Sequence, residues 1–166
     1  MYHFPVDRSA IYYIFDRDPR SNRQADVIKE LLGELTNARD NEQSYVQGLL
    51  LLSYPAIEAF ILSNFKDVQQ LQFGLGKALK QYIYDQKVDG YKRIQEKNLL
   101  IAVEQMYNSM GSLGITDYDI DSLGKVNIEI FEAQEAIYKK QQQYNLLSLF
   151  GIVLMDLGIV SCDDEV

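Results

Sequence analysis

The sequence predicts an α/β fold, with a parallel βαβ unit followed by a mainly helical C-terminal half. Two apolar runs, residues 10–15 and 45–52, are rich in β-forming side chains and have the length of buried strands. Between them, apolar residues recur at helical spacing. A strand, a helix and a second strand make a βαβ unit, and the two strands of such a crossover pair in parallel.

The first strand, residues 10–15, leads into the helix of this unit. Ser21 or Asn22 can cap the start of the helix, because their side chains accept hydrogen bonds from free backbone N–H groups. The helix should run to about Ala38, just before a polar loop. The apolar positions that define its buried face are Ala25, Ile28, Leu31, Leu32 and Leu35.

The second strand ends at Ser53-Tyr54-Pro55, and helices follow it. The apolar spacing predicts a short helix after Pro55 and three longer ones. The last apolar segment, about 146–157, fits either a strand or a helix, because periodicity does not separate the two for a short run. The three longer helices should cover about 70–85, 92–110 and 122–144.

Length and composition predict a single domain over residues 1–166. The chain is 47% hydrophobic and carries 12 Tyr and 7 Phe, which fits a globular protein with a sizeable core. It has no internal repeat and no low-complexity linker. We therefore expect a βαβ core over residues 1–65, with residues 66–166 as its helical extension.

Charge is unevenly distributed along the chain. The net charge of −8 argues against broad, nonspecific binding of nucleic acid. Residues 66–97 nevertheless hold seven basic and four acidic residues, whereas residues 117–166 hold three basic and ten acidic ones. One part of the molecule can therefore face phosphates, although ordinary solvated helix faces explain the same pattern.

The chain has one cysteine, Cys162, so an internal disulfide and a cysteine-based zinc site are both excluded. A reduced, cytoplasmic setting is the expectation. The N-terminus lacks the apolar stretch of a secretory signal. The most apolar C-terminal run, 146–160, is too short and too interrupted to span a membrane, so no membrane partner is expected.

The acidic motif Asp16-Arg17-Asp18 follows directly on the first strand. In open α/β sheets, ligands bind at the carboxyl ends of the strands, where these two aspartates should lie. Mg²⁺ is usually held by one or two carboxylates, water and substrate phosphates, so the pair suits this ion. A turn built from Asp18 and Pro19 explains the same residues without any ligand.

Other enzyme families also use two aspartates separated by one residue, but they fit this chain less well. Haloacid-dehalogenase-type phosphatases want Thr or Val two residues after the second aspartate, where this chain has Arg20. Nucleotide-sugar glycosyltransferases need a larger donor-binding domain than 166 residues provide.

A second motif follows the second strand, and the two motifs together resemble the Toprim domain. Residues 53–62 read Ser-Tyr-Pro-Ala-Ile-Glu-Ala-Phe-Ile-Leu. The small Toprim-like proteins of bacterial anti-phage systems, the RloB-like and abortive-infection group related to OLD-type nucleases, combine such an S-x-P-x-x-E-x-[WF] segment with an upstream D-R-D motif. The resemblance covers residues 10–65, in which Ser53, Pro55, Glu58 and Phe60 match the second motif.

This resemblance implies metal-dependent cleavage of a nucleic-acid phosphodiester, in DNA or RNA. Asp16 and Asp18 would hold Mg²⁺, with Mn²⁺ as a substitute, and the ion would stabilise the charge that develops on the phosphate. Glu58 would be a further ligand or a general base, unless it only complements a helix N-terminus. Arg17 and Arg20 would contact the phosphate backbone, or else form ion pairs or face solvent.

The resemblance also implies a role in anti-phage defence beside an ATPase partner. Toprim domains usually carry a catalytic glutamate after an earlier strand, but the first glutamate of this chain is Glu30, so this N-terminal part is expected to be absent. Without that strand the apolar run Ile11–Phe15 has an exposed edge, which favours a homodimer or a hetero-complex. The alternative function is a catalytically inactive, Toprim-derived interaction or regulatory subunit.

Overall fold

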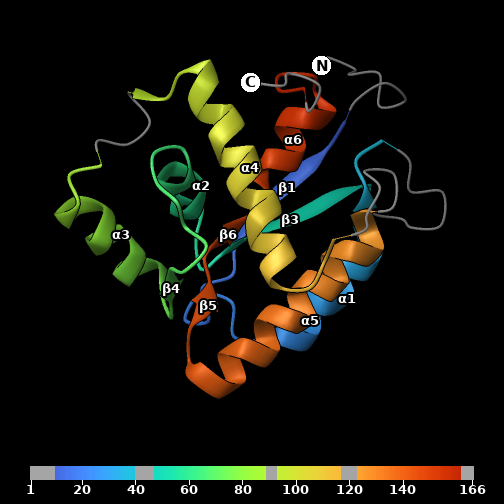
Figure 1. The fold of residues 1–166 in the computed structure, drawn as a ribbon. Helices are drawn as coiled ribbons and strands as arrows, with labels where there is room; N and C mark the ends of the chain where they lie inside the picture. Colours follow the sequence, from blue (N-terminus) through green and yellow to red (C-terminus); the bar gives the residue numbers. More distant parts are fainter. Residues whose placement is uncertain (1–9, 40–46, 89–92, 117–122, 162–166) are drawn as a thin grey trace, which may run out of the picture.

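The computed structural model describes residues 10–39, 47–88, 93–116 and 123–161, which form a mixed α/β fold (Figure 1). Strand β1 (Tyr12–Asp16) pairs in parallel with β3 (Gly48–Tyr54), and Asp16 lies opposite Ser53. Helix α1 (Ala25–Glu34) connects the two strands. The parallel βαβ unit predicted from the sequence is therefore confirmed.

Both predicted ends of the α1 helix are wrong. The helix starts after Gln24, and the Asn22 side chain does not cap it but donates to the backbone oxygen of Asp16. The helix stops at Glu34, because the chain then turns into the short strand β2 (Thr36–Asn37), which pairs antiparallel with the start of β3. The sequence instead predicts these strand residues to be in the last turn of the helix.

Strand β3 lies at the centre of the sheet and is buried along its whole length. Its end pairs antiparallel with β6 (Leu147–Ser148), on the side away from β1. The side-chain oxygens of Ser53 and Ser148 share a hydrogen bond of 2.8 Å at this junction. Residues 66–166 therefore supply a strand of the main sheet as well as helices.

The remaining elements largely follow the predicted helices. The range 70–85 is helical only from residue 76, since residues 72 and 73 form a strand, and 146–157 contains both a strand and a helix. Strands β4 and β5 pair with each other as a second, two-stranded sheet. These elements are α2 (Glu58–Ser63), β4 (Gln72–Phe73), α3 (Gly76–Asp85), α4 (Glu96–Ser112), α5 (Leu123–Gln141), β5 (Tyr144–Asn145) and α6 (Phe150–Asp156).

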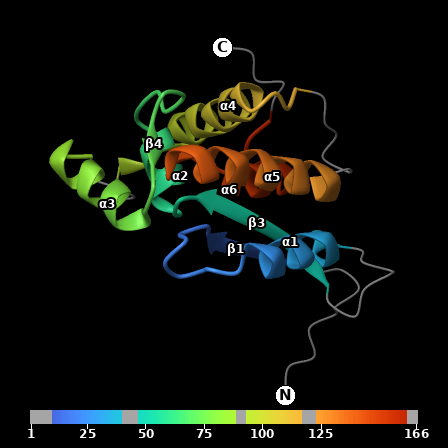
Figure 2. The ribbon, with the colours of Figure 1, turned by 90° about the horizontal axis from the view of Figure 1, so that it is seen from below.

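Helices cover both faces and one edge of the β1–β3 pair. Helix α1 lies over Leu50 and Leu52 on one face, and α6 approaches Tyr12 and Leu49 on the other. Helix α5 lies along the edge of β3, where the Asn127 side chain donates to the backbone oxygen of Leu50. In Figure 2, β3 accordingly runs between α1 and α5. None of the helices in the described residues is long and apolar enough to cross a membrane.

Candidate functional site

The acidic motif lies at the carboxyl end of the parallel pair. Asp16 is the last residue of β1, and the backbone N–H of Arg17 still bonds to the Ser53 oxygen of β3. Strand β3 ends one residue later, at Tyr54, and leads into α2. The two segments that carry the predicted site residues therefore leave the sheet side by side.

The Asp16 carboxylate is oriented by the start of α2. Its Oδ1 accepts the backbone N–H of Ile57 at 2.8 Å, and Ile57 directly precedes the first residue of the helix. A first-turn N–H has no partner within its own helix, so this bond satisfies it. The other oxygen, Oδ2, has no hydrogen-bond partner among the described residues, which leaves it available to a ligand.

The Asp18 carboxylate is oriented by the start of α3. Its Oδ2 accepts the Gly76 N–H at 3.0 Å, and its Oδ1 accepts the Arg20 N–H at 2.9 Å. A Cβ atom on Gly76 would lie 3.1 Å from Oδ2 of Asp18 and 3.0 Å from the Cβ of Ala56. A glycine therefore suits this close approach between the loop and the helix.

Glu58 follows Ile57 in the first turn of α2. Its Oε1 lies 3.3 Å from the Lys80 ammonium of α3, and its Oε2 is buried without a hydrogen-bond partner. Across the described ranges, no three His, Cys, Asp or Glu side chains are grouped so that they could hold a metal ion. A metal held here by Asp16 and Asp18 would thus need water and phosphate to complete its coordination, a ligand set typical of Mg²⁺.

Arg17 points away from this edge and into the protein. It is 3% exposed, its Nε lies 2.9 Å from Oε1 of Glu135 on α5, and its Nη1 donates to the Asn22 backbone oxygen. The guanidinium also lies 5.7 Å from the ring centres of Phe131 and Tyr144. Of the three roles that the sequence leaves open for Arg17, the structure shows the ion pair, and a phosphate contact would require the side chain to leave it.

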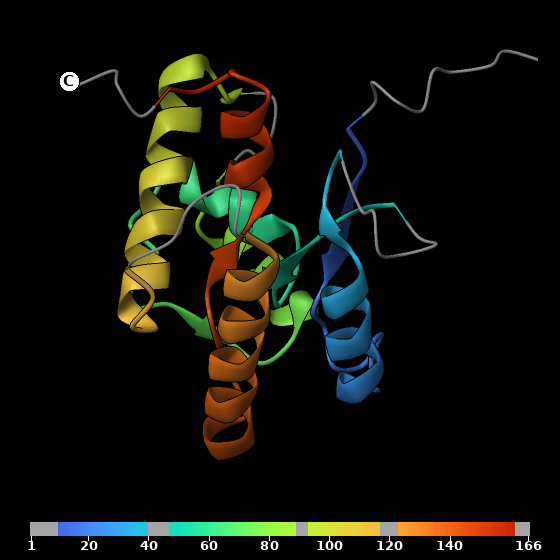
Figure 3. The same ribbon diagram turned by 90° about the vertical axis from the view of Figure 1, so that its right-hand side faces the viewer.

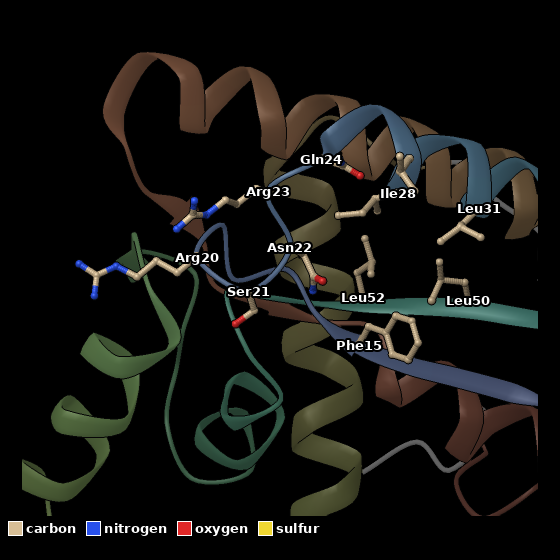
Figure 4. Close-up of a pocket in the computed structure, with 11 residues that line it drawn as sticks. Phe15, Arg20, Ser21, Asn22, Arg23, Gln24, Ile28, Leu31, Leu50 and Leu52 are labelled. Carbon is tan, nitrogen blue, oxygen red and sulfur yellow. The ribbon is translucent and has the colours of Figure 1, made fainter.

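Arg20 and Arg23 extend from the loop that joins β1 to α1. Both are exposed, and neither forms an ion pair with a described residue. Figure 4 shows both guanidinium groups on the same side of this loop. Arg23 was missed from the sequence, although a second arginine three residues after Arg20 in a glycine-free polar loop was a visible signal. The pair offers two free cations next to the acidic motif.

A buried polar cluster behind the motif was also missed. Glu135 accepts the Tyr144 hydroxyl at 2.9 Å, and the Tyr144 ring packs edge-on against Tyr54, with 5.6 Å between ring centres. Burial first, and the Glu135 charge second, raise the pKa of Tyr54 well above its usual value. Burial likewise raises the pKa of Tyr144. The available signal was Glu135 at helical spacing from Phe131, which places a carboxylate on the apolar stripe of α5.

Comparisons with protein-family models, with curated proteins and with solved structures found no match for this chain. The likeness to Toprim domains is therefore carried by the two short motifs alone, Asp16-Arg17-Asp18 and the segment from Ser53 to Phe60.

Proposed function

We propose that this chain is a Toprim-type nuclease domain that cleaves nucleic-acid phosphodiesters with a bound Mg²⁺, in anti-phage defence beside an ATPase partner. The observation that carries the proposal is the way Asp16 and Asp18 are held. Both lie at the carboxyl end of a parallel strand pair, and a backbone N–H at the start of a separate helix fixes each carboxylate.

The residues present fit a magnesium ion. Metal-binding carboxylates are themselves hydrogen-bonded by surrounding groups, which fix their orientation. The N–H groups of Ile57 and Gly76 play this part, while Oδ2 of Asp16 keeps its lone pairs. A divalent ion bound there supplies charge stabilisation to a phosphate undergoing displacement.

We assign phosphate binding, proton acceptance and positioning to the side chains near Asp16 and Asp18. Arg20 and Arg23 bind the phosphates that flank the scissile bond, since guanidinium groups form paired hydrogen bonds with phosphate oxygens. Glu58 is the candidate proton acceptor, because its Oε2 has no partner and its Oε1 has only the contact with Lys80. Arg17 contributes indirectly, by anchoring the motif to α5 through Glu135.

A second candidate function is a Toprim-derived interaction or regulatory subunit without activity. The same hydrogen bonds also favour this second function, because through them Asp16 and Asp18 already link the loop to α2 and α3. In that case the two aspartates serve the fold and bind no metal.

A cleavage assay on labelled DNA and RNA, with Mg²⁺ or Mn²⁺ and with excess chelator, separates the two functions. The proposal expects cleavage that needs the metal and is lost in Asp16→Asn/Asp18→Asn. Asp26→Asn is the matched control, because Asp26 is an exposed acid in the first turn of α1. If no DNA or RNA substrate is cleaved with either metal, the result would favour the regulatory subunit.

A further inference from the structure

In the described residues, the outer edge of β1 is open along most of its length; at the carboxyl end the Asn22 side chain donates to the outward backbone oxygen of Asp16. Within the described ranges β1 pairs only with β3. The bonds from the Leu49 N–H to the Ile11 oxygen and from the Arg17 N–H to the Ser53 oxygen show that the odd-numbered residues of this segment turn their backbone groups toward β3. The backbone groups of Ile14 therefore face outward, and no described residue bonds to them. Figure 3 shows β1 and α1 together at one side of the molecule, away from α4.

Upstream of Asp16, the described residues give this edge none of the usual protection against pairing. Natural edge strands carry lysine, proline, a bulge or a covering segment, whereas β1 reads Tyr-Tyr-Ile-Phe-Asp over five regular residues. An apolar groove of about 420 Å³ opens beside it, between α1 and the sheet (Figure 4). Phe15 on its strand side and Val27 on its helix side are 49% and 45% exposed. Together, the open edge and the groove form a surface suited to another strand and helix.

The charges along α1 indicate which strand and helix fit. Gln24, Val27 and Leu31 line the groove at helical spacing. Arg23 lies at the N-terminal end of this stripe and Glu34 continues it at the C-terminal end; both are exposed, and no described residue forms an ion pair with either. A stripe with a cation at one end and an anion at the other is complementary to its own copy when the two run antiparallel.

We propose that two copies of this chain pair antiparallel along β1, about a two-fold axis at Ile14. Ile14 then exchanges both of its outward hydrogen bonds with Ile14 of the second copy, and Tyr13 lies opposite Phe15, an aromatic pair that stabilises adjacent strands. The two α1 helices lie on the same face, with Val27 and Leu31 in contact and Arg23 opposite Glu34. The sheet becomes continuous across the dimer. This pairing does not depend on metal binding.

Sedimentation velocity over a range of concentrations tests the dimer. The wild-type chain should reach twice its mass of 19.1 kDa. Ile14→Pro removes only an outward N–H, so it leaves the ladder to β3 intact and should raise the dimer dissociation constant about tenfold or more. Ile14→Val, which keeps that N–H, should dimerise normally, and circular dichroism should report the same fold for both variants.

Charge reversal tests the orientation separately. Arg23→Glu and Glu34→Arg should each weaken the dimer, since each sets like charges opposite one another, and the combined exchange should restore it. A wild-type chain that stays monomeric would overturn the proposal. A dimer unaffected by Ile14→Pro, or one that the charge exchange fails to restore, would overturn the assignment to this edge.

Discussion

The Arg17–Glu135 ion pair joins the strand end of the candidate site to α5. Both residues are nearly buried, and the Arg17 Nε–H does not point at the nearby carboxylate oxygen, so that contact is ionic and not a hydrogen bond. The aromatic rings of Phe131 and Tyr144 flank the cation. A buried pair of this kind costs desolvation on forming, but loss of either partner leaves the other charge uncompensated.

Glu135→Gln should therefore lower the free energy of unfolding by about 3–5 kcal/mol, measured by chemical denaturation. The matched control is Glu132→Gln on the same helix, whose exposed pair with Lys29 should contribute about 0–1 kcal/mol. If the two substitutions lowered the free energy of unfolding equally, the Arg17–Glu135 pair would not stabilise the fold as a buried ion pair.

The buried tyrosines Tyr54 and Tyr144 predict a loss of stability in alkali. Burial raises the pKa of both hydroxyls, while in the unfolded chain they ionise near their usual value of about 10. Below that pH, their contribution to the free energy of unfolding is fully present. Above it the unfolded state releases protons that the folded state keeps, so the free energy of unfolding falls as pH rises.

Denaturation at several pH values, with tyrosinate absorbance followed in parallel, checks this expectation. Tyr54→Phe should reduce the alkaline loss, and it should cost little at neutral pH because the Tyr54 hydroxyl is buried without a hydrogen-bond partner. If Tyr54 ionised near pH 10, the usual value for a tyrosine hydroxyl, the pKa assignment would be wrong.

At the scale of elements, the contact between α5 and β2 depends on Gly124. A Cβ atom at this position would lie 2.7 Å from the Cβ of Thr36. Gly124→Ala should therefore force the helix from the strand and cost about 1–3 kcal/mol of unfolding free energy.

Gly33 provides the comparison for that substitution. It also lies within a helix, but a Cβ atom there meets nothing within 4 Å. Gly33→Ala should raise the free energy of unfolding by up to about 1 kcal/mol, because alanine is the better helix former. Thermal melts of the two variants should move in opposite directions, and a stabilising Gly124→Ala would contradict the packing described here.

Elements with their own pattern could be predicted from the sequence, and those without one could not. Strand β3 and helices α4 and α5 are long enough for their apolar patterns to predict the element type. Strands β2 and β6 have two residues each, too few for any periodicity, and they exist only because β3 offers them hydrogen bonds. The end of α1 was missed for this reason.

The same limit applies to the candidate site. The place of Asp16 and Asp18 at the strand end followed from one local run of residues. The burial of Arg17 depends on Glu135, far along the chain, so no local pattern could reveal it. The bonds from Ile57 and Gly76 likewise arise only when α2 and α3 pack beside the motif.

At the scale of the whole molecule, the acidic motif Asp16-Arg17-Asp18 and the open outer edge both belong to the β1 segment. Asp16 and Asp18 lie at its carboxyl end, beside Arg20 and Arg23, which form no ion pair with a described residue. The outward backbone of Ile14 lies midway along it. One short strand thus carries both the proposed metal site and the proposed dimer contact, and Ile14→Pro should weaken the dimer without removing metal binding.

Calorimetric titration of Mn²⁺ into the wild-type chain and into Asp16→Asn/Asp18→Asn tests the proposed metal site most directly. We expect the wild type and the Asp26→Asn control to bind Mn²⁺, and the double variant to lose at least about 100-fold in affinity. Binding that the double variant retains, or a wild-type chain that binds no metal, would contradict it.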